Sequence, residues 1–152
     1  MPVWMSVKPK FANLILDGVK NVEVRRWLPG TILRERTCIV YASSPLCAVL
    51  GEVTIEEIKK VAIQSEEDLA EIAELAKASE DELRRYLEGR DHAYLITLDG
   101  PVRYPNPLPL EDLRRLIKER LNMDFHPNPL FRVDQEVLNV VRSAVGVSDR
   151  LF

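Results

Sequence analysis

The sequence of 152 residues is poor in the side chains that bind metal ions, with only two cysteines and two histidines. It has no C-x-x-C or H-x-x-H spacing, so we expect no zinc site, and no motif in it indicates another metal or a cofactor. Cys38 and Cys47 both lie in apolar segments that resemble strands. Free cysteines in such segments are usually buried thiols, and we expect no disulfide.

Long hydrophobic runs are also missing. No segment approaches the roughly 18 consecutive apolar residues that a membrane-spanning helix needs. The N-terminus has no basic segment followed by an apolar one, the pattern of a secretion signal. We therefore expect a cytoplasmic protein without a membrane partner. A chain of this length is sufficient for one domain with its own hydrophobic core.

An excess of basic residues is absent overall, since the net charge is −3. The charge is unevenly distributed, however. Residues 1–60 contain nine Lys and Arg against six Asp and Glu, whereas residues 61–100 contain four against eleven. The composition therefore does not indicate nucleic-acid binding by the whole surface, but it leaves room for a local basic site.

The elements follow from hydrophobic periodicity, capping residues and turn residues. The expected strands cover 3–7, 20–27, 37–42, 46–59, 92–98 and 102–108, and the expected helices cover 9–17, two segments within 66–88, 110–121 and 134–143. A turn at 99–101 (DGP) should separate the last two strands, and three prolines should place 102–108 at an edge. Gly51 should mark a bulge or a close approach of two backbones.

This order of elements predicts an α+β fold. The first helix lies between two strands, but the later strands mostly follow one another without helices between them, which argues against an open parallel sheet with helices on both faces. A mostly antiparallel β-barrel of five or six strands with helices on its rim fits the order better. We expect residues 1–130 to form this domain and residues 131–152 to form a helical tail packed on it.

The segment GVKNVEVRR (18–26) carries unusually many charges for a short strand. Strand alternation places Val22 and Val24 on one face, where they can fill the barrel interior, and Glu23 and Arg25 on the other. Lys20 lies just beyond the end of the first helix, where a cation is favourable. The charges can form a structural ion-pair cluster or line a polar site, and the residue pattern leaves both open.

Several segments together resemble the ASCH domain family. They are SVKPKFA at 6–12, LILDGVKNVEVRR at 14–26, YASSP at 41–45, GEV at 51–53 and AYLI at 93–96. Members of that family show a serine-x-lysine-proline start and a glycine-x-lysine-x-x-(glutamate or threonine)-x-arginine core. The likeness covers roughly residues 3–122.

The resemblance implies a PUA-like barrel with a cleft beside the first helix that binds RNA or a nucleotide-like ligand. One branch of the family consists of small amidohydrolases acting on acetylated cytidine through the core lysine, a threonine and a glutamate. Lys20 matches that lysine, but Glu23 stands at the threonine position. The glutamate form is more similar to a branch regarded as transcription regulators, for which no reaction is assigned.

Seven residues are the candidates for ligand contact: Lys8, Lys20, Glu23, Arg25, Ser43, Ser44 and Tyr94. The cations can bind a phosphate, and Glu23 can accept a hydrogen bond from the exocyclic amine of a base. The serines either present hydroxyl groups to a ligand or bond their own turn, and Tyr94 either stacks on a base or packs locally. If the protein is an enzyme, Lys20 and Glu23 are the catalytic candidates.

Three functions are therefore compatible with the sequence. The first is a domain that binds RNA or a nucleotide-like ligand and regulates transcription or RNA metabolism. The second is an amidohydrolase acting on an acetylated cytidine nucleoside. The third is a protein-interaction module that uses the acidic helices within 66–88.

Overall fold

The computed structural model of the chain describes residues 1–147. Its strands are β1 (Val3–Val7), β2 (Val22–Arg25), β3 (Thr37–Ala42), β4 (Ala48–Ala62), β5 (His92–Pro109) and β6 (Leu130–Arg132). Its helices are α1 (Pro9–Leu16), the short 3-10 helix η1 (Gly30–Ile32), α2 (Glu66–Ala76), α3 (Glu80–Tyr86), α4 (Leu110–Leu121) and α5 (Gln135–Val145).

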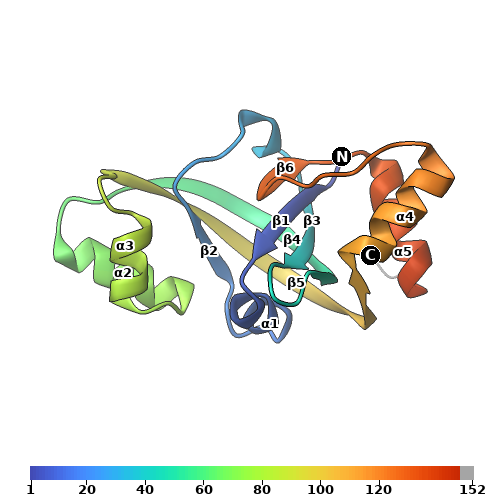
Figure 1. Cartoon of the computed structure of the whole chain (residues 1–152). Coiled ribbons are helices and arrows are strands. Elements are labelled where there is room, and N and C mark those ends of the chain that lie inside the picture. Colours follow the sequence, from blue (N-terminus) through green and yellow to red (C-terminus); the bar gives the residue numbers. More distant parts are fainter. Residues whose placement is uncertain (148–152) are drawn as a thin grey trace.

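The six strands form one curled sheet in the order β2-β5-β4-β3-β1-β6 (Figure 1). Only β1 and β3 pair in parallel, with α1 and β2 lying between them in sequence; the other four pairs are antiparallel. The predicted α+β fold, with a mostly antiparallel sheet of five or six strands and surrounding helices, is confirmed. The sheet is a half-barrel, with β2 and β6 as its edge strands.

One predicted turn is wrong. Residues 99–101 do not end a strand, because β5 continues through them to Pro109. Glu52 pairs with Val102 and Thr54 pairs with Asp99, so β5 has one residue more than β4 between these pairs. Gly100 absorbs this bulge with φ = +56°, a conformation that glycine adopts without steric cost. The segment 102–108 is extended, as predicted, and β4 is its only paired strand among the described residues.

Alternation along the strands gives the sheet two apolar faces. Val3, Met5 and Val7 of β1 belong to the core that α1 and η1 cover, and we call this side the α1 face. Trp4 points to the opposite face, where α4 and α5 pack. At the other end of that opposite face, α2 and α3 cover the ends of β4 and β5 (Figure 1).

Gly51 lies where α1 and the neighbouring strand β5 approach β4 closely. A β-carbon at this position would lie 2.3 Å from the carbonyl oxygen of Val102 and 2.8 Å from a methyl carbon of Leu16. The register of β4 also shifts between Val49 and Gly51 on both of its partner strands. Both expectations for this glycine, a bulge and a close backbone approach, are therefore confirmed.

The end of the chain contains an element that the sequence did not reveal. Residues 130–132 form β6 and pair with β1, and α5 follows as the predicted last helix. The division of the chain at 130/131 stays a prediction, and residues 148–152 of the expected tail lie outside the described residues. Within 1–147, no helix is both long and apolar enough to cross a bilayer.

Candidate functional site

Strand β2 presents its charged side chains to the α1 face. Glu23 pairs with Ile96 and Arg25 pairs with Tyr94, and directly paired residues share a face of the sheet. Ile96 belongs to the core under α1. Val24 points the other way and packs against the apolar residues of α2 and α3. The prediction that Val24 fills the barrel interior is therefore wrong, because these two helices supply a second apolar surface that buries it.

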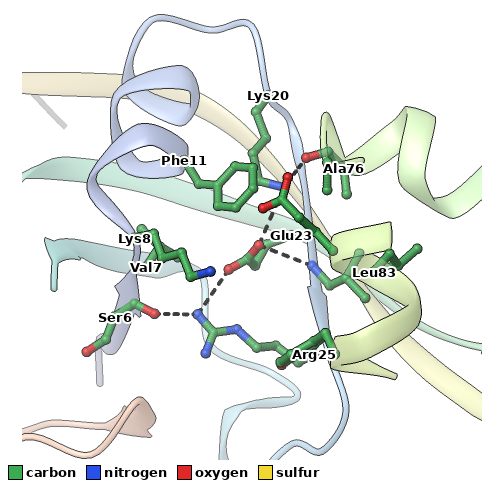
Figure 2. A pocket seen from close by; sticks show the side chains of 13 residues that line it. Ser6, Val7, Lys8, Phe11, Lys20, Glu23, Arg25, Ala76 and Leu83 are labelled. Carbon is green, nitrogen blue, oxygen red and sulfur yellow. Dashed lines mark hydrogen bonds and ion pairs between the residues drawn. The ribbon is translucent and has the colours of Figure 1, made fainter. Parts of the chain in front are cut away.

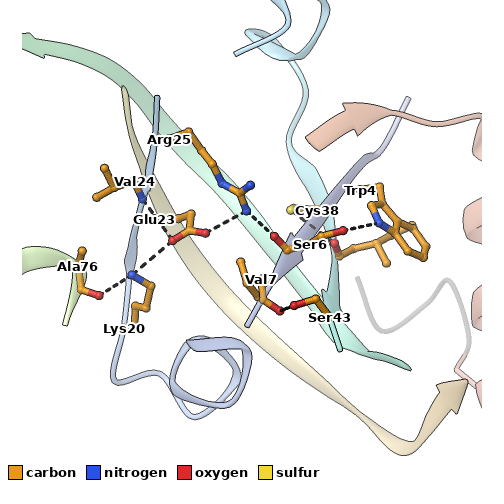
Figure 3. A network of polar contacts seen from close by, with 11 residues as sticks. Trp4, Ser6, Val7, Lys20, Glu23, Val24, Arg25, Cys38, Ser43 and Ala76 are labelled. Carbon is orange, nitrogen blue, oxygen red and sulfur yellow. Dashed lines mark hydrogen bonds and ion pairs between the residues drawn. The ribbon is translucent and has the colours of Figure 1, made fainter. Parts of the chain in front are cut away.

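Lys20, Glu23 and Arg25 form a continuous chain of charges in this site (Figure 3). Lys20 Nζ lies 3.5 Å from Glu23 Oε1, and Arg25 Nη2 lies 3.0 Å from Glu23 Oε2. The backbone N–H of Val24 also donates to Glu23 Oε1, at 3.2 Å. Glu23 is 9% exposed, so it is a buried partner of both cations, and the charges form an ion-pair cluster that also lines a polar cavity.

Lys20 is the most deeply buried of the three, with 2% of its surface exposed. Its ammonium donates a hydrogen bond to the carbonyl oxygen of Ala76, the last residue of α2, where the helix dipole favours a cation. It also lies 4.9 Å from the centre of the Phe11 ring. Burial lowers the pKa of Lys20 below its usual value, while the neighbouring Glu23 carboxylate acts in the opposite direction.

Arg25 connects the charge chain to β1. Its Nη2 donates to the carbonyl oxygen of Ser6 at 2.7 Å as well as to Glu23. Its Nε is buried and has no acceptor among residues 1–147. A buried N–H without an acceptor is uncommon in folded proteins. In the described part of the chain Nη1 also donates to no group, which leaves it available to an oxygen atom of a ligand.

These side chains line a cavity of about 190 Å³ between α1, β2 and the α2–α3 pair (Figure 2). Its lining residues are Ser6, Val7, Lys8, Phe11, Lys20, Glu23, Val24, Arg25, Ala76, Ala78, Glu82, Leu83 and Tyr86. Of the seven predicted ligand-binding residues, the structure brings four together here: Lys8, Lys20, Glu23 and Arg25. Lys8 differs from the other three in being exposed.

Sequence reasoning missed the wall that α3 contributes. Glu82 forms an ion pair with Lys10 of α1 at 2.9 Å, and Tyr86 stands below the guanidinium of Arg26, 5.0 Å from the ring centre. Glu82 also forms a capping box with Ser79 at the start of α3, a local role that the sequence pattern Ser79-x-x-Glu82 indicates. The capping role accounts for a glutamate at this position, so nothing in the sequence indicated its second contact, with Lys10 across 72 residues.

The other three predicted residues lie outside the cavity lining. Ser43 donates from Oγ to the carbonyl oxygen of Val7. Its own carbonyl oxygen accepts from the N–H groups of Leu46 and Cys47, so Ser43 stabilises the turn between β3 and β4. Ser44 is exposed. Tyr94 is half-buried beside Arg25, and its ring meets that of His92 edge-on at 5.5 Å. Whether these three contact a ligand stays a prediction.

In residues 1–147, no group of three or more His, Cys, Asp or Glu side chains is arranged to hold a metal ion. The two free cysteines differ in environment. Cys38 is buried, as expected, whereas the expectation of burial is wrong for Cys47, which is exposed. Burial raises the pKa of Cys38 to about 12, so its thiol stays protonated near neutral pH.

A half-barrel with a polar cavity beside its first helix places the protein in the class of PUA-like domains. The match to the ASCH domain covers residues 5–101, and the chain belongs to the ASCH domain family. It is similar to an ASCH domain-containing ribonuclease of Zymomonas mobilis, with 32% identity over 116 residues, which cover 74% of this chain and 73% of that protein.

Solved structures agree with this assignment. The crystal structure of ASCH from Zymomonas mobilis superposes with a TM-score of 0.77 and 26% identity, covering 93% of this chain and 94% of the other. The N-terminal domain of Staphylothermus marinus McrB superposes with a TM-score of 0.58 and 15% identity over 93% of both chains. At that identity the second likeness shows the fold alone.

Proposed function

We propose that this protein binds single-stranded RNA and holds one nucleotide unit of it in the cavity formed by α1, β2 and α3. The observation that carries the proposal is the buried Lys20–Glu23–Arg25 chain, in which Arg25 retains donors without an acceptor in the described chain. The similarity to an ASCH domain-containing ribonuclease supports RNA as the ligand class.

The size and charge of the cavity support a small, anionic ligand group. About 190 Å³ is less than the roughly 300–1,000 Å³ of pockets that enclose drug-sized molecules. The cavity therefore suits part of a nucleotide rather than a folded RNA element. Its lining contains three cations, Lys8, Lys20 and Arg25, against two carboxylates, Glu23 and Glu82. The positive balance favours a phosphate group.

Glu23 adds a preference among bases. An ionised carboxylate offers about four lone-pair sites, and contacts from Lys20, Arg25 and the Val24 backbone occupy three. The remaining site can accept from the exocyclic amine of cytosine or adenine, whereas uracil presents a carbonyl oxygen at the corresponding position. We therefore propose that the cavity prefers cytidine to uridine nucleotides.

The first prediction is that CMP binds, and binds at least about tenfold more tightly than UMP, because a hydrogen bond to a charged group contributes roughly 1.5–3 kcal/mol. Isothermal titration calorimetry measures both affinities. Lys20→Ala and Arg25→Ala should each weaken CMP binding by a similar or larger factor.

Arg115→Ala is the matched control, because Arg115 is an exposed residue of α4, which lies at the other end of the molecule from α3 (Figure 1). It should leave the affinity unchanged, and thermal melting should show that every variant is folded. Equal binding of CMP by the wild-type protein and by a folded Arg25→Ala variant would exclude this cavity as the site.

A second candidate function is cleavage of the bound RNA, and the lowered pKa of Lys20 favours it. In RNA cleavage the 2′-hydroxyl attacks the adjacent phosphorus, a base takes its proton, and the 5′-oxygen leaves with a proton from an acid. A lysine that loses its proton more easily than usual can act as that base, and Arg25 can stabilise the charge on the phosphate. The similar Zymomonas protein is named as a ribonuclease.

The second prediction therefore concerns Lys20→Arg. Arginine retains a positive charge but does not deprotonate in proteins, so this variant should bind a cytidine oligonucleotide and fail to cleave it. Gel electrophoresis of a labelled oligonucleotide measures cleavage, and a 2′-deoxy substrate is the control that should stay intact. Cleavage by Lys20→Arg at the wild-type rate would exclude Lys20 as the base. Release of acetate from N4-acetylcytidine would instead favour the amidohydrolase alternative.

A further inference from the structure

We propose a second RNA subsite beside the cavity, on the α1 face of the sheet, where Arg25, Tyr94 and Lys60 form a row across three strands. This inference rests on the proposed binding of RNA and extends it. The cavity takes one nucleotide unit, and the row holds the next unit of a single strand. The protein would then bind an oligonucleotide more tightly than a free nucleotide.

The strand register defines the row. Arg25 of β2 pairs with Tyr94 of β5, and Tyr94 pairs in turn with Lys60 of β4. Directly paired residues point to the same face, and neighbouring strands lie about 4.8 Å apart. The tyrosine ring therefore stands between two cations whose backbones are roughly 10 Å from each other.

The row combines a half-buried aromatic ring, which is held in place, with an exposed lysine that a ligand can reach. Tyr94 packs against the core of the α1 face with part of its ring and is half-buried, while Lys60 is exposed. The His92 ring meets Tyr94 edge-on at 5.5 Å and restricts its orientation. A base can stack on the exposed part of a ring that is already held in place, at little cost in side-chain entropy.

Charge and continuity indicate which partner fits this row. Arg25 belongs to both the cavity and the row, so a strand that leaves the cavity passes Tyr94 next. Lys60 then lies where it can neutralise the following phosphate. The row also has an acidic neighbour: Asp91 contacts His92 Nδ1 at 2.8 Å and is 94% exposed. Asp91 also lies near enough to Lys60 for this lysine to help lower its pKa, and Glu23 is paired with Arg25, so each cation of the row has one acidic neighbour.

The experiment compares a mononucleotide with an oligonucleotide. CMP is titrated by calorimetry, and a fluorescein-labelled cytidine hexanucleotide is titrated by fluorescence anisotropy. Tyr94→Ala should leave CMP affinity within about twofold, because Tyr94 does not line the cavity. The same variant should weaken hexanucleotide binding by about 5- to 150-fold, the range for loss of one base–aromatic stack. Tyr94→Phe keeps the ring and should restore the affinity.

The two adjacent lysines of β4 provide a matched pair for the phosphate contact. Lys60 pairs with Tyr94 on the α1 face, whereas Lys59 pairs with Leu95 and points to the opposite face. Both are exposed, so neither change should unfold the protein. Lys60→Ala should make the slope of log affinity against log salt shallower by about 0.7 for the hexanucleotide. Lys59→Ala should leave that slope unchanged.

The outcomes separate this inference from the proposed function. Wild-type protein that binds neither CMP nor the hexanucleotide would overturn both. Hexanucleotide binding that Tyr94→Ala and Lys60→Ala leave unchanged would overturn the second subsite alone. Equal effects of Lys60→Ala and Lys59→Ala on the salt dependence would show a diffuse charge effect and would also overturn it.

Discussion

At the scale of single residues, the site depends on how Glu23 compensates two buried cations. Glu23 contacts both Lys20 and Arg25, and all three side chains are largely withdrawn from water. Charges are costly to bury unless a partner of opposite sign accompanies them. The carboxylate is therefore the group on which the ionisation of Lys20 depends.

The third prediction is that Glu23→Gln destabilises the protein by about 3 kcal/mol at pH 7, because it leaves two buried cations without a counter-charge. Burial already lowers the pKa of Lys20, and loss of the Glu23 charge should lower it further. In the variant, Lys20 therefore binds more protons in the unfolded state than in the folded state, up to a pH of about 10.5. Stability of the variant should thus rise, relative to wild type, as the pH increases through this window.

Urea unfolding at pH 7 and pH 9.5 measures this difference. Cys38 does not confuse the comparison. Its pKa is raised to about 12 in the folded protein, mainly by burial and only to a smaller extent by Glu23, so the thiol lowers the stability of both proteins in the same direction above pH 9. Glu71→Gln, at an exposed position of α2, is the control and should change stability by less than about 0.5 kcal/mol. If the loss of stability caused by Glu23→Gln did not depend on pH, the ionisation of Lys20 would not be coupled to Glu23.

At the scale of elements, the sequence predicted what local signals determine. Strands β1 and β3 have the predicted bounds, because runs of apolar, β-branched and aromatic residues end at recognisable turns. Helix α1 begins at Pro9, and α3 begins after the N-cap Ser79, whose capping box with Glu82 is a local sequence signal. Gly51 was also identified correctly, since a glycine inside a strand usually marks a bulge or a close contact.

Features that depend on distant parts of the chain were less predictable. The three residues of β6 have no strand pattern of their own and form a strand only because β1 offers an unpaired edge. The orientation of β2 depends on which face the α2–α3 pair covers, and alternation alone does not specify this. Lys20, Glu23 and Arg25 were predicted as candidates because they lie in one short segment of the sequence. Glu82 and Tyr86 were not, because they reach the cavity from the distant helix α3.

The placement of α2 and α3 also explains how the cavity is held together. Lys20 bonds the last carbonyl of α2, and Lys10 of α1 bonds Glu82 of α3. These two contacts join both sides of the cavity across more than fifty residues of sequence. Val24 packs below the same helices. Strand β2 therefore supports the helices through Val24, while Glu23 and Arg25 on its other face supply charged groups to the cavity.

At the scale of the whole molecule, a second buried charge cluster lies away from the cavity. Arg142 of α5 binds Glu52 of β4 through two hydrogen bonds, at 2.7 Å and 3.0 Å, and the Tyr104 hydroxyl donates to the same carboxylate. Burial raises the pKa of Tyr104, so this hydroxyl remains a donor. Glu52 is 1% exposed. The cluster fastens α5 to the centre of the sheet, and none of its members lines the cavity.

The last prediction is that this cluster contributes to stability without taking part in ligand binding. Arg142→Met leaves a buried carboxylate without its cation and should cost about 3–5 kcal/mol in the free energy of unfolding. The double change Glu52→Gln with Arg142→Met removes both charges and should recover part of that loss. Chemical denaturation measures the three stabilities. Arg120→Met is the control, because Arg120 bonds α5 at an exposed position, through Ser143 Oγ.

Folded Arg142→Met protein should bind CMP as tightly as wild type, since the cavity lies against α2 and α3, whereas α5 covers the other end of the sheet. If Arg142→Met weakened CMP binding in the folded protein, the two ends of the sheet would be coupled through β4 and β5. If instead the double variant were less stable than the single one, the hydrogen bonds of Glu52 would matter more than its charge. Recovery of stability with unchanged binding is expected, because the sheet carries its binding cavity and its C-terminal helix on separate, independently packed cores.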